Sequence, residues 1–206
     1  MDFKEIQDKL DELFPQPKCE LNYNNNYELL VAVILSAQCT DKRVNIVTED
    51  LFKLYNTPDK MLLLSQSELE DKIRSCGFYR NKAKNILAMS GDLVEKYQGQ
   101  VPSSVEELQT LAGVGRKTAN VVYAEAFKGD AIAVDTHVLR VSNRLGLVKT
   151  GKPYECERAL MNNFDKSAWS KLHLQMVHFG RYICKAQKPD CVNCPFKKIC
   201  VQYTKI

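Results

Sequence analysis

Lys117 and Asp135 are the two residues whose types and positions most clearly predict chemistry in this sequence. Lys117 comes two residues after the turn Gly113-Val114-Gly115, and Asp135 ends an apolar run eighteen residues further on. A lysine amine can attack an electrophilic carbon once it has lost its proton. A nearby carboxylate can accept that proton and stabilise positive charge on the substrate. The pair therefore predicts covalent catalysis through an amine.

The glycine turn itself predicts a binding site for a phosphate. Gly113 can adopt a left-handed backbone at the end of one helix, and Gly115 lets a ligand approach the backbone closely. The next helix should begin near Arg116, so its first amides lie at the positive end of the helix dipole, where an anion binds well. A DNA phosphate is the best candidate, held by residues of the turn and the first helical turn: Gly113, Val114, Gly115, Arg116 and Thr118. The alternative is a helix-turn-helix corner that needs glycine only for its shape.

The positions of the lysine and the aspartate each have a local consequence. An ammonium group is disfavoured at a helix N-terminus, and any desolvation also favours the neutral amine, so Lys117 is placed to be reactive. Asp135 precedes an apparently helical segment at residues 136–146, and an N-cap role explains it without catalysis. Both roles can hold together, because a cap also fixes the carboxylate in place.

The hydrophobic pattern around these residues is mostly helical, with Gly and Pro separating the periodic segments. Ser103 or Ser104 can cap the helix before the turn, and Glu106 or Glu107 can complete a capping box. Residues 29–35 fit a buried strand as well as a helix, because they are apolar throughout. We expect helices near residues 3–14, 27–38, 42–55, 67–75, 80–97, 104–112, 116–127, 136–146, 154–163 and 168–183.

Composition and charge limit the class of protein. The chain has 206 residues, 45% of them hydrophobic, which suits one compact unit or two small lobes. Net charge is only +4, but residues 165–206 carry eight Lys or Arg against two acidic residues. Such a basic region is typical of a protein that binds a phosphate backbone, although an ordinary solvated surface also explains it. No segment approaches the ~20 apolar residues that span a bilayer, so we expect a soluble cytoplasmic protein without membrane contact.

Cysteines are concentrated near the C-terminus. A disulfide framework does not fit a reducing compartment, and zinc sites usually pair two short C-x2-C or C-x4-C knuckles, of which only one occurs here. The wide, uneven spacing C-x6-C-x2-C-x5-C favours a [4Fe–4S] cluster, with zinc as the alternative. The predicted ligands are Cys184, Cys191, Cys194 and Cys200. The remaining cysteines are scattered and are expected to be small buried side chains: Cys19, Cys39, Cys76 and Cys156.

Four lysines lie between the predicted cluster ligands: Lys185, Lys188, Lys197 and Lys198. A cluster that fixes these loops would present the lysines rigidly to a DNA backbone. Electron transfer is the competing role for the cluster, and nothing in the sequence requires it.

Together these features resemble the helix-hairpin-helix family of DNA glycosylases, in its endonuclease III branch. The resemblance covers nearly the whole chain. Beyond the hairpin lysine, the aspartate and the four cysteines, it includes the segments LSAQCTD (35–41), GFYRNKA (77–83), AVDTHV (133–138) and HFGRY (178–182). Hairpins of this kind are widespread, but their combination with the lysine, the aspartate and the cysteine spacing is highly specific.

The resemblance implies an all-α, two-lobed fold. A six-helix lobe with the hairpin would span residues 19–130, and residues 1–18 and 131–206 would form a discontinuous lobe with the cluster. Residues 29–37 would then be a buried helix. The implied partner is double-stranded DNA with a damaged base or an abasic site, bound by a monomer associated with the nucleoid.

The resemblance also implies an activity, a bifunctional DNA glycosylase and abasic-site lyase of base excision repair. Lys117 would attack C1′ of the flipped nucleotide, and Asp135 would take the lysine's proton. The resulting Schiff base would allow strand cleavage 3′ to the lesion by β-elimination. The implied substrates are oxidised or ring-saturated pyrimidines such as thymine glycol.

Several DNA contacts are implied as well. Gln38 would fill the space that the flipped nucleotide leaves, and Phe78 and Tyr79 would wedge the opposite strand. Independently of the resemblance, His137 lies two residues past Asp135 and could touch DNA, although an exposed position at the start of a helix explains it equally well. The chain departs from the family at two of these places: Phe78 stands where leucine is usual, and Ala112 where the hairpin usually has proline.

Two other functions are compatible with parts of this pattern. A monofunctional glycosylase of the same fold, of the type that removes adenine opposite oxidised guanine, shares the C-x6-C-x2-C-x5-C spacing but lacks the hairpin lysine and has an extra C-terminal domain. A non-catalytic iron–sulfur protein that binds DNA would use the hairpin and the basic loops without needing both Lys117 and Asp135.

Overall fold

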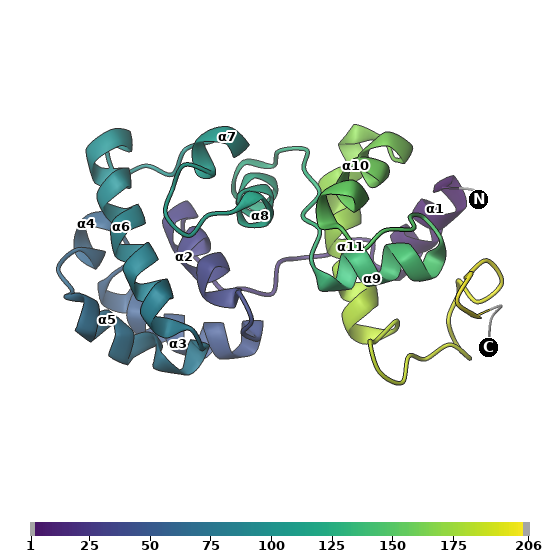
Figure 1. Ribbon diagram of the computed structural model, residues 1–206, viewed down its shortest axis with the longest axis horizontal. Coiled ribbons are helices and arrows are strands. Elements are labelled where there is room, and N and C mark those ends of the chain that lie inside the picture. The colour runs from purple at the N-terminus through teal and green to yellow at the C-terminus, as the bar shows by residue number, and fades with distance from the viewer. Residues whose placement is uncertain (1–2, 204–206) are drawn as a thin grey trace. The chain divides into compact units, whose positions relative to one another are not determined.

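All regular secondary structure in the described part of the chain, residues 3–203, is helical (Figure 1). In this computed structural model the residues fall into two compact units: Glu20–Phe127 forms one, and Met1–Cys19 together with Lys128–Ile206 forms the other. The expected all-α class is therefore confirmed. No helix of the described residues is long and apolar enough to cross a membrane.

The unit Glu20–Phe127 is built around one apolar helix. Its α-helices are α2 (Asn26–Ser36), α3 (Asp41–Leu54), α4 (Pro58–Met61), α5 (Gln66–Ile73), α6 (Tyr79–Tyr97), α7 (Val105–Leu108) and α8 (Arg116–Phe127), with a 3-10 turn η1 (Arg74–Cys76) before α6. Helix α2 packs against α3, α6 and α8 (Figure 1). Every residue from Tyr27 to Leu35 is buried, which explains why this segment has no amphipathic period.

Short polar side chains fix where the helices of this unit begin. Asn25, Thr40, Thr57, Ser65 and Ser104 each accept a hydrogen bond from the backbone amide three residues later. Such caps satisfy amides that have no partner inside the helix. Of the two serines expected to start the helix before the glycine turn, Ser104 is the cap.

Two elements of this unit differ from expectation. The helix expected at residues 104–112 ends at Leu108, because the amides of Thr110 and Leu111 bond to carbonyls three residues back instead of four. The single turn α4 was not expected, and it begins with Pro58 just after its cap Thr57. The resemblance implies six helices in this lobe, and the described residues form seven once α4 is counted.

The second unit joins the N-terminal helix to the C-terminal third of the chain. Its helices are α1 (Phe3–Leu13), α9 (Thr136–Leu145), α10 (Pro153–Asn163) and α11 (Trp169–Tyr182), with a 3-10 turn η2 (Lys166–Ala168) before α11. Helix α11 packs against α9 and α1. The core contains Ile6 and Leu10 of α1 and extends to Phe179 and Phe196, whose rings meet edge to face. Phe196 thus anchors the segment after α11 to the same core.

Polar contacts hold α1 against α11. The Gln175 amide nitrogen donates to the Asp11 carboxylate and to the Phe14 carbonyl, and Gln7 donates back to the Gln175 oxygen. Lys171 adds an ion pair with Asp11. Because Gln175 is completely buried and its partners lie more than 150 residues earlier, these bonds explain how the two ends of the chain form one unit.

Candidate active site

The turn between α7 and α8 is a tight hairpin that its own residues hold in place. Gly113 has a φ of +78°, the left-handed conformation expected for it. Val114 is buried, and its amide donates to the Leu111 carbonyl at 3.1 Å. The side chain and the amide of Val114 therefore anchor the hairpin, so Val114 has neither group free for a phosphate. The first hydrogen bond of α8 runs from Ala119 to Gly115, so the amides of residues 116–118 precede the helical ladder.

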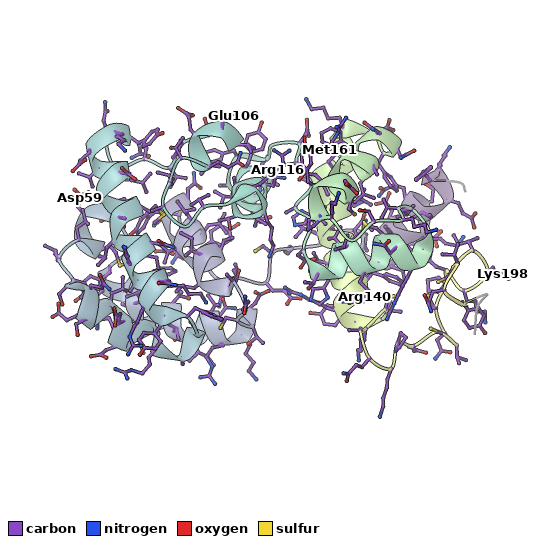
Figure 2. The ribbon with its side chains drawn as sticks, in the orientation of Figure 1. Asp59, Glu106, Arg116, Arg140, Met161 and Lys198 are labelled. Atoms are coloured by element: carbon purple, nitrogen blue, oxygen red, sulfur yellow. The ribbon has the colours of Figure 1, made fainter. Side chains whose placement is uncertain are left out.

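Lys117 lies in the first turn of α8 with an exposed side chain. It makes no hydrogen bond or ion pair with any residue in the described part of the chain. The neighbouring Arg116 is also exposed and extends from the start of the same helix (Figure 2). The desolvation expected for Lys117 is therefore absent from the protein alone, and only a bound substrate would remove water from its amine.

Asp135 is the N-cap of α9, as its sequence position suggested. Its Oδ1 accepts the amides of His137 and Val138, both at 2.8 Å. Oδ2 accepts no hydrogen bond from any residue that the structure describes. The cap therefore holds the carboxylate rigidly and leaves one oxygen available to accept a proton.

Two exposed side chains stand on strained turns of the unit Glu20–Phe127. Gln38, just after α2, has a φ of +55°, and Phe78, just before α6, has a φ of +46°. Phe78 is 65% exposed although it is a large apolar residue. A left-handed backbone is uncommon outside glycine and tends to occur at functional sites. Gln38 and Phe78 are therefore exposed to solvent, and contacts with the surrounding structure must maintain their left-handed backbone conformation.

Two other predicted DNA contacts have partners within the protein. The guanidinium groups of Arg74 and Arg80 lie over the Tyr79 ring, at 5.5 and 5.1 Å from its centroid. A Tyr79 ring held in this way is engaged by cation–π contacts instead of projecting freely toward a base. His137 is half-buried rather than exposed, and its Nδ1 lies 3.2 Å from Arg140.

The four C-terminal cysteines line a single pocket, together with Arg144, Phe179 and Tyr203. Burial raises the pKa of the Cys194 thiol, a backbone contact with Phe196 opposes this, and the other three thiols raise it further. The other three thiols thus lie close enough to influence Cys194. Among the described residues, no three His, Cys, Asp or Glu side chains are already arranged as a metal-ion site.

Arg144 on α9 organises this pocket, and sequence reasoning did not identify it. Its guanidinium donates to the carbonyls of Lys185 and Ala186 and lies 3.5 Å from the Cys184 sulfur. Its own carbonyl accepts the Cys200 thiol at 3.1 Å. Arg144 therefore connects the two ends of the segment from Cys184 to Cys200, which contains the four cysteines. Nothing in the sequence indicated this role beyond the position of Arg144 directly before Leu145, which the structure shows to be buried.

The lysines between the cysteines are exposed (Lys185, Lys188, Lys197 and Lys198), and Figure 2 shows Lys198 on the C-terminal segment. Lys197 also donates to the Val192 carbonyl. Lys205, which contributes to the charge of residues 165–206, lies outside the described residues. The scattered cysteines divide into two groups: Cys76 and Cys156 are buried as expected, but Cys19 and Cys39 are only half-buried.

Comparison with known proteins agrees with this arrangement. Residues 31–166 match the family described as HhH-GPD superfamily base excision DNA repair protein. Endonuclease III of Bacillus subtilis is 49% identical over 204 residues, which cover 97% of this chain and 93% of that protein.

Two solved structures are similar over nearly their whole length. One shows a non-covalent endonuclease III–DNA complex, with a TM-score of 0.95, 49% identity and coverage of 98% of this chain and 95% of that one. The other shows a trapped endonuclease III–DNA covalent intermediate, with a TM-score of 0.96, 48% identity and coverage of 100% and 98%. The chain belongs to the endonuclease III family of the HhH-GPD superfamily, the bifunctional DNA N-glycosylases and abasic-site lyases of base excision repair.

Proposed function

We propose that this chain excises oxidised or ring-saturated pyrimidines such as thymine glycol from double-stranded DNA, with Lys117 as nucleophile and Asp135 as proton acceptor. The observation that carries the proposal is a hairpin with Gly113 in the left-handed conformation, followed in the first turn of the next helix by an exposed lysine that pairs with none of the described residues. Membership of the endonuclease III family and the covalent DNA complex of a 48% identical relative support it. We further propose that the protein acts as a monomer.

The chemistry begins when the Lys117 amine gives up a proton, which the Asp135 carboxylate accepts directly or through water. The amine attacks C1′ of the target nucleotide, the glycosidic bond breaks, and the base leaves with the electron pair of that bond. Opening of the sugar ring turns the new C1′–N bond into a Schiff base. The iminium acidifies a C2′ proton, and its loss expels the 3′ phosphate oxygen by β-elimination. Water then releases the lysine. One lysine thus accounts for both base excision and strand cleavage.

Access to C1′ requires the nucleotide to leave the base stack, at a cost of a few kcal/mol that is smaller for a damaged base. Gln38 and Phe78 are the side chains that fit this step. Gln38 would occupy the vacated space with a polar group, and Phe78 would insert an apolar wedge that unstacks the opposite strand. The cation–π contacts of Tyr79 with Arg74 and Arg80 make Phe78 the better wedge of the Phe78-Tyr79 pair.

The two hairpin glycines should respond differently to replacement by alanine. At Gly113 a Cβ would lie 2.8 Å from the Asn85 Cβ and would also have to accept a left-handed φ. We expect Gly113→Ala to lower the free energy of unfolding by about 2–4 kcal/mol. At Gly115 a Cβ would meet no atom within 4 Å. Gly115→Ala should change stability by less than about 1 kcal/mol, yet weaken DNA binding because the methyl group would obstruct a phosphate.

Chemical denaturation and fluorescence anisotropy with a duplex oligonucleotide separate these two effects. The proposed phosphate site would be wrong if Gly115→Ala bound DNA as tightly as the wild-type protein.

Four cysteines, Cys184, Cys191, Cys194 and Cys200, would hold a [4Fe–4S] cluster. Their common pocket and their number fit such a group. When bound, the cluster would supply four metal–thiolate bonds that fix the segment after α11. The chain's own contribution is to present Lys185 and Lys188, both exposed between the ligands, as fixed positive charges for a DNA backbone.

Replacing one proposed ligand tests the cluster. We expect Cys194→Ser to lose most of its iron and its visible absorption, and to make residues 184–203 more sensitive to protease, because the segment then loses one of its four anchors. Cys19→Ser is the matched control, since Cys19 is half-buried and outside the pocket. Stoichiometric zinc with no iron in the wild-type protein would contradict the iron–sulfur proposal.

Substrate class is tested with matched duplexes that carry thymine glycol, 8-oxoguanine, or adenine opposite 8-oxoguanine. The proposal predicts excision and strand cleavage on the first, and much slower reaction on the other two. Faster removal of adenine, without strand cleavage, would contradict it.

A further inference from the structure

Lys82 on α6 is a buried lysine with an unusual set of partners. Only 5% of its surface is exposed. Its Nζ donates to three backbone carbonyls, those of Leu35 and Ala37 at 2.8 Å and that of Cys76 at 2.7 Å. An ammonium group has three donors, so this set uses all of them. No carboxylate pairs with Lys82 among the residues that the structure describes.

The three carbonyls come from two turns that are far apart in the sequence. Leu35 and Ala37 lie at the C-terminal end of α2, directly before Gln38. Cys76 ends the 3-10 turn η1 and lies two residues before Phe78. A positive charge is favourable at the C-terminus of a helix, where carbonyls lack partners. Lys82 is therefore the residue that ties the Gln38 turn to the Phe78 turn.

Other contacts show that the two turns are packed together. The Cys39 thiol lies within hydrogen-bonding reach of the Cys76 thiol, so each turn also contributes one cysteine to the contact. Burial, followed by the charge and hydrogen bond of Cys39, raises the pKa of Cys76 to about 11. The amide of Lys82 also donates to the Phe78 carbonyl at 3.1 Å. Lys82 thus contacts the Phe78 turn through both its backbone and its side chain.

Stability alone is a weak reason for this arrangement. Burying an ammonium group without a carboxylate partner is unfavourable, and burial lowers the pKa of Lys82 accordingly. Yet both turns hold a non-glycine residue in the left-handed region, and such conformations persist only where surrounding contacts enforce them. The three bonds of Lys82 are contacts of that kind, made to both turns from one atom.

We propose that Lys82 is a positioning residue for nucleotide extrusion, which locks the turns that present Gln38 and Phe78 into one rigid element. This inference rests on the proposed roles of Gln38 and Phe78 in DNA. Lys82 itself touches no reacting atom. Its effect is to keep the two side chains at a fixed separation, so that filling the vacated space and wedging the opposite strand occur as one event.

The test compares Lys82→Met with Tyr27→Phe. Methionine keeps a linear apolar side chain but donates no hydrogen bond. Tyr27 is buried at the other end of α2, where its hydroxyl contacts Ser90 at 2.7 Å. Tyr27→Phe thus removes a buried hydrogen bond from the same unit without changing a contact of the Gln38 turn or the Phe78 turn. Both variants are studied well below their melting temperatures.

Three readouts distinguish positioning from a general loss of structure. The first is amide hydrogen exchange of residues 36–40 and 76–82 in the free protein. The second is single-turnover excision of thymine glycol from a duplex, which requires extrusion. The third is cleavage of a preformed abasic site in single-stranded DNA, which requires the chemistry but no displacement of a paired base.

For Lys82→Met we expect faster exchange in both turns, excision from the duplex slowed by about tenfold or more, and single-strand cleavage close to the wild-type rate. Tyr27→Phe should leave all three readouts near wild type. The proposal is overturned if exchange changes in neither turn or only one, if duplex excision is unaffected, or if both rates fall equally. If the wild-type protein cleaves neither substrate, the proposed function fails instead, and hydrogen exchange alone decides whether Lys82 fixes the two turns.

Discussion

Replacing Lys117 with glutamine is expected to abolish base excision while leaving DNA binding largely intact. The variant keeps a polar side chain of similar length but has no nucleophilic amine, so the single-turnover rate constant on a thymine glycol duplex should fall by at least about 10³-fold. Affinity for the same duplex should stay within about tenfold, because one positive charge is a small part of the contact with a phosphate backbone. Folding should be unchanged, since Lys117 is exposed and has no partner among the described residues.

The matched control is Lys53→Gln, which removes one positive charge from the same unit. Lys53 is exposed, and within residues 3–203 it pairs only with Asp50 three residues away. Its loss should leave both excision and binding near the wild-type values. If Lys117→Gln retained substantial excision, a water molecule or another amine would have to be the nucleophile. If it lost binding to the same extent as excision, Lys117 would be a phosphate contact only.

The second large effect is expected at Asp135, where two substitutions separate the cap from the chemistry. Asparagine caps a helix about as well as aspartate, but it cannot accept a proton. Asp135→Asn should therefore slow excision by about 10²–10⁴-fold with little change in stability. Asp135→Ala should slow excision to a similar extent and also lower the free energy of unfolding by about 1 kcal/mol, because the amides of His137 and Val138 lose their acceptor.

Ser65→Ala serves as the cap control, since Ser65 forms a complete capping box with Glu68 in α5 and belongs to no proposed site. It should lower stability by about 1 kcal/mol with unchanged excision. Stability is measured by urea denaturation and excision under single-turnover conditions. Full activity in Asp135→Asn would show that Asp135 acts only as a helix cap.

Much of the fold could be predicted because local pattern decides it. The segments around Lys117 and Asp135 carry their own glycine and capping signals, and the structure places α8 and α9 where those signals predict. The apolar segment of α2 was ambiguous, because a helix that is buried on all sides has no amphipathic period. The short helix α7 ends before its predicted boundary because the amides of Thr110 and Leu111 bond to carbonyls three residues back, and the apolar pattern of residues 104–112 does not reveal that change.

The residues that organise the sites could not be predicted in the same way. Arg144 bonds to two carbonyls about 40 residues away, and Lys82 bonds to two carbonyls about 45 residues away as well as to that of Cys76. No sequence spacing reveals the distant contacts. The sequence carries one sign that Lys82 is buried: it lies directly before Ala83 and four residues before Ile86, and both of these are on the buried face of α6. Tyr79 shows a different limit, because the resemblance implied that it wedges the DNA strand, whereas Arg74 and Arg80 contact its ring within the protein.

The most direct test of the central proposal is borohydride trapping on a duplex with one thymine glycol, followed by peptide mapping of the crosslink. Borohydride reduces a lysine–sugar Schiff base to a stable secondary amine, so the position of the sugar remnant identifies the nucleophile. We predict one crosslinked peptide, with the remnant on Lys117. A remnant on another lysine, or no crosslink from protein that still binds and processes the duplex, would contradict the proposed mechanism.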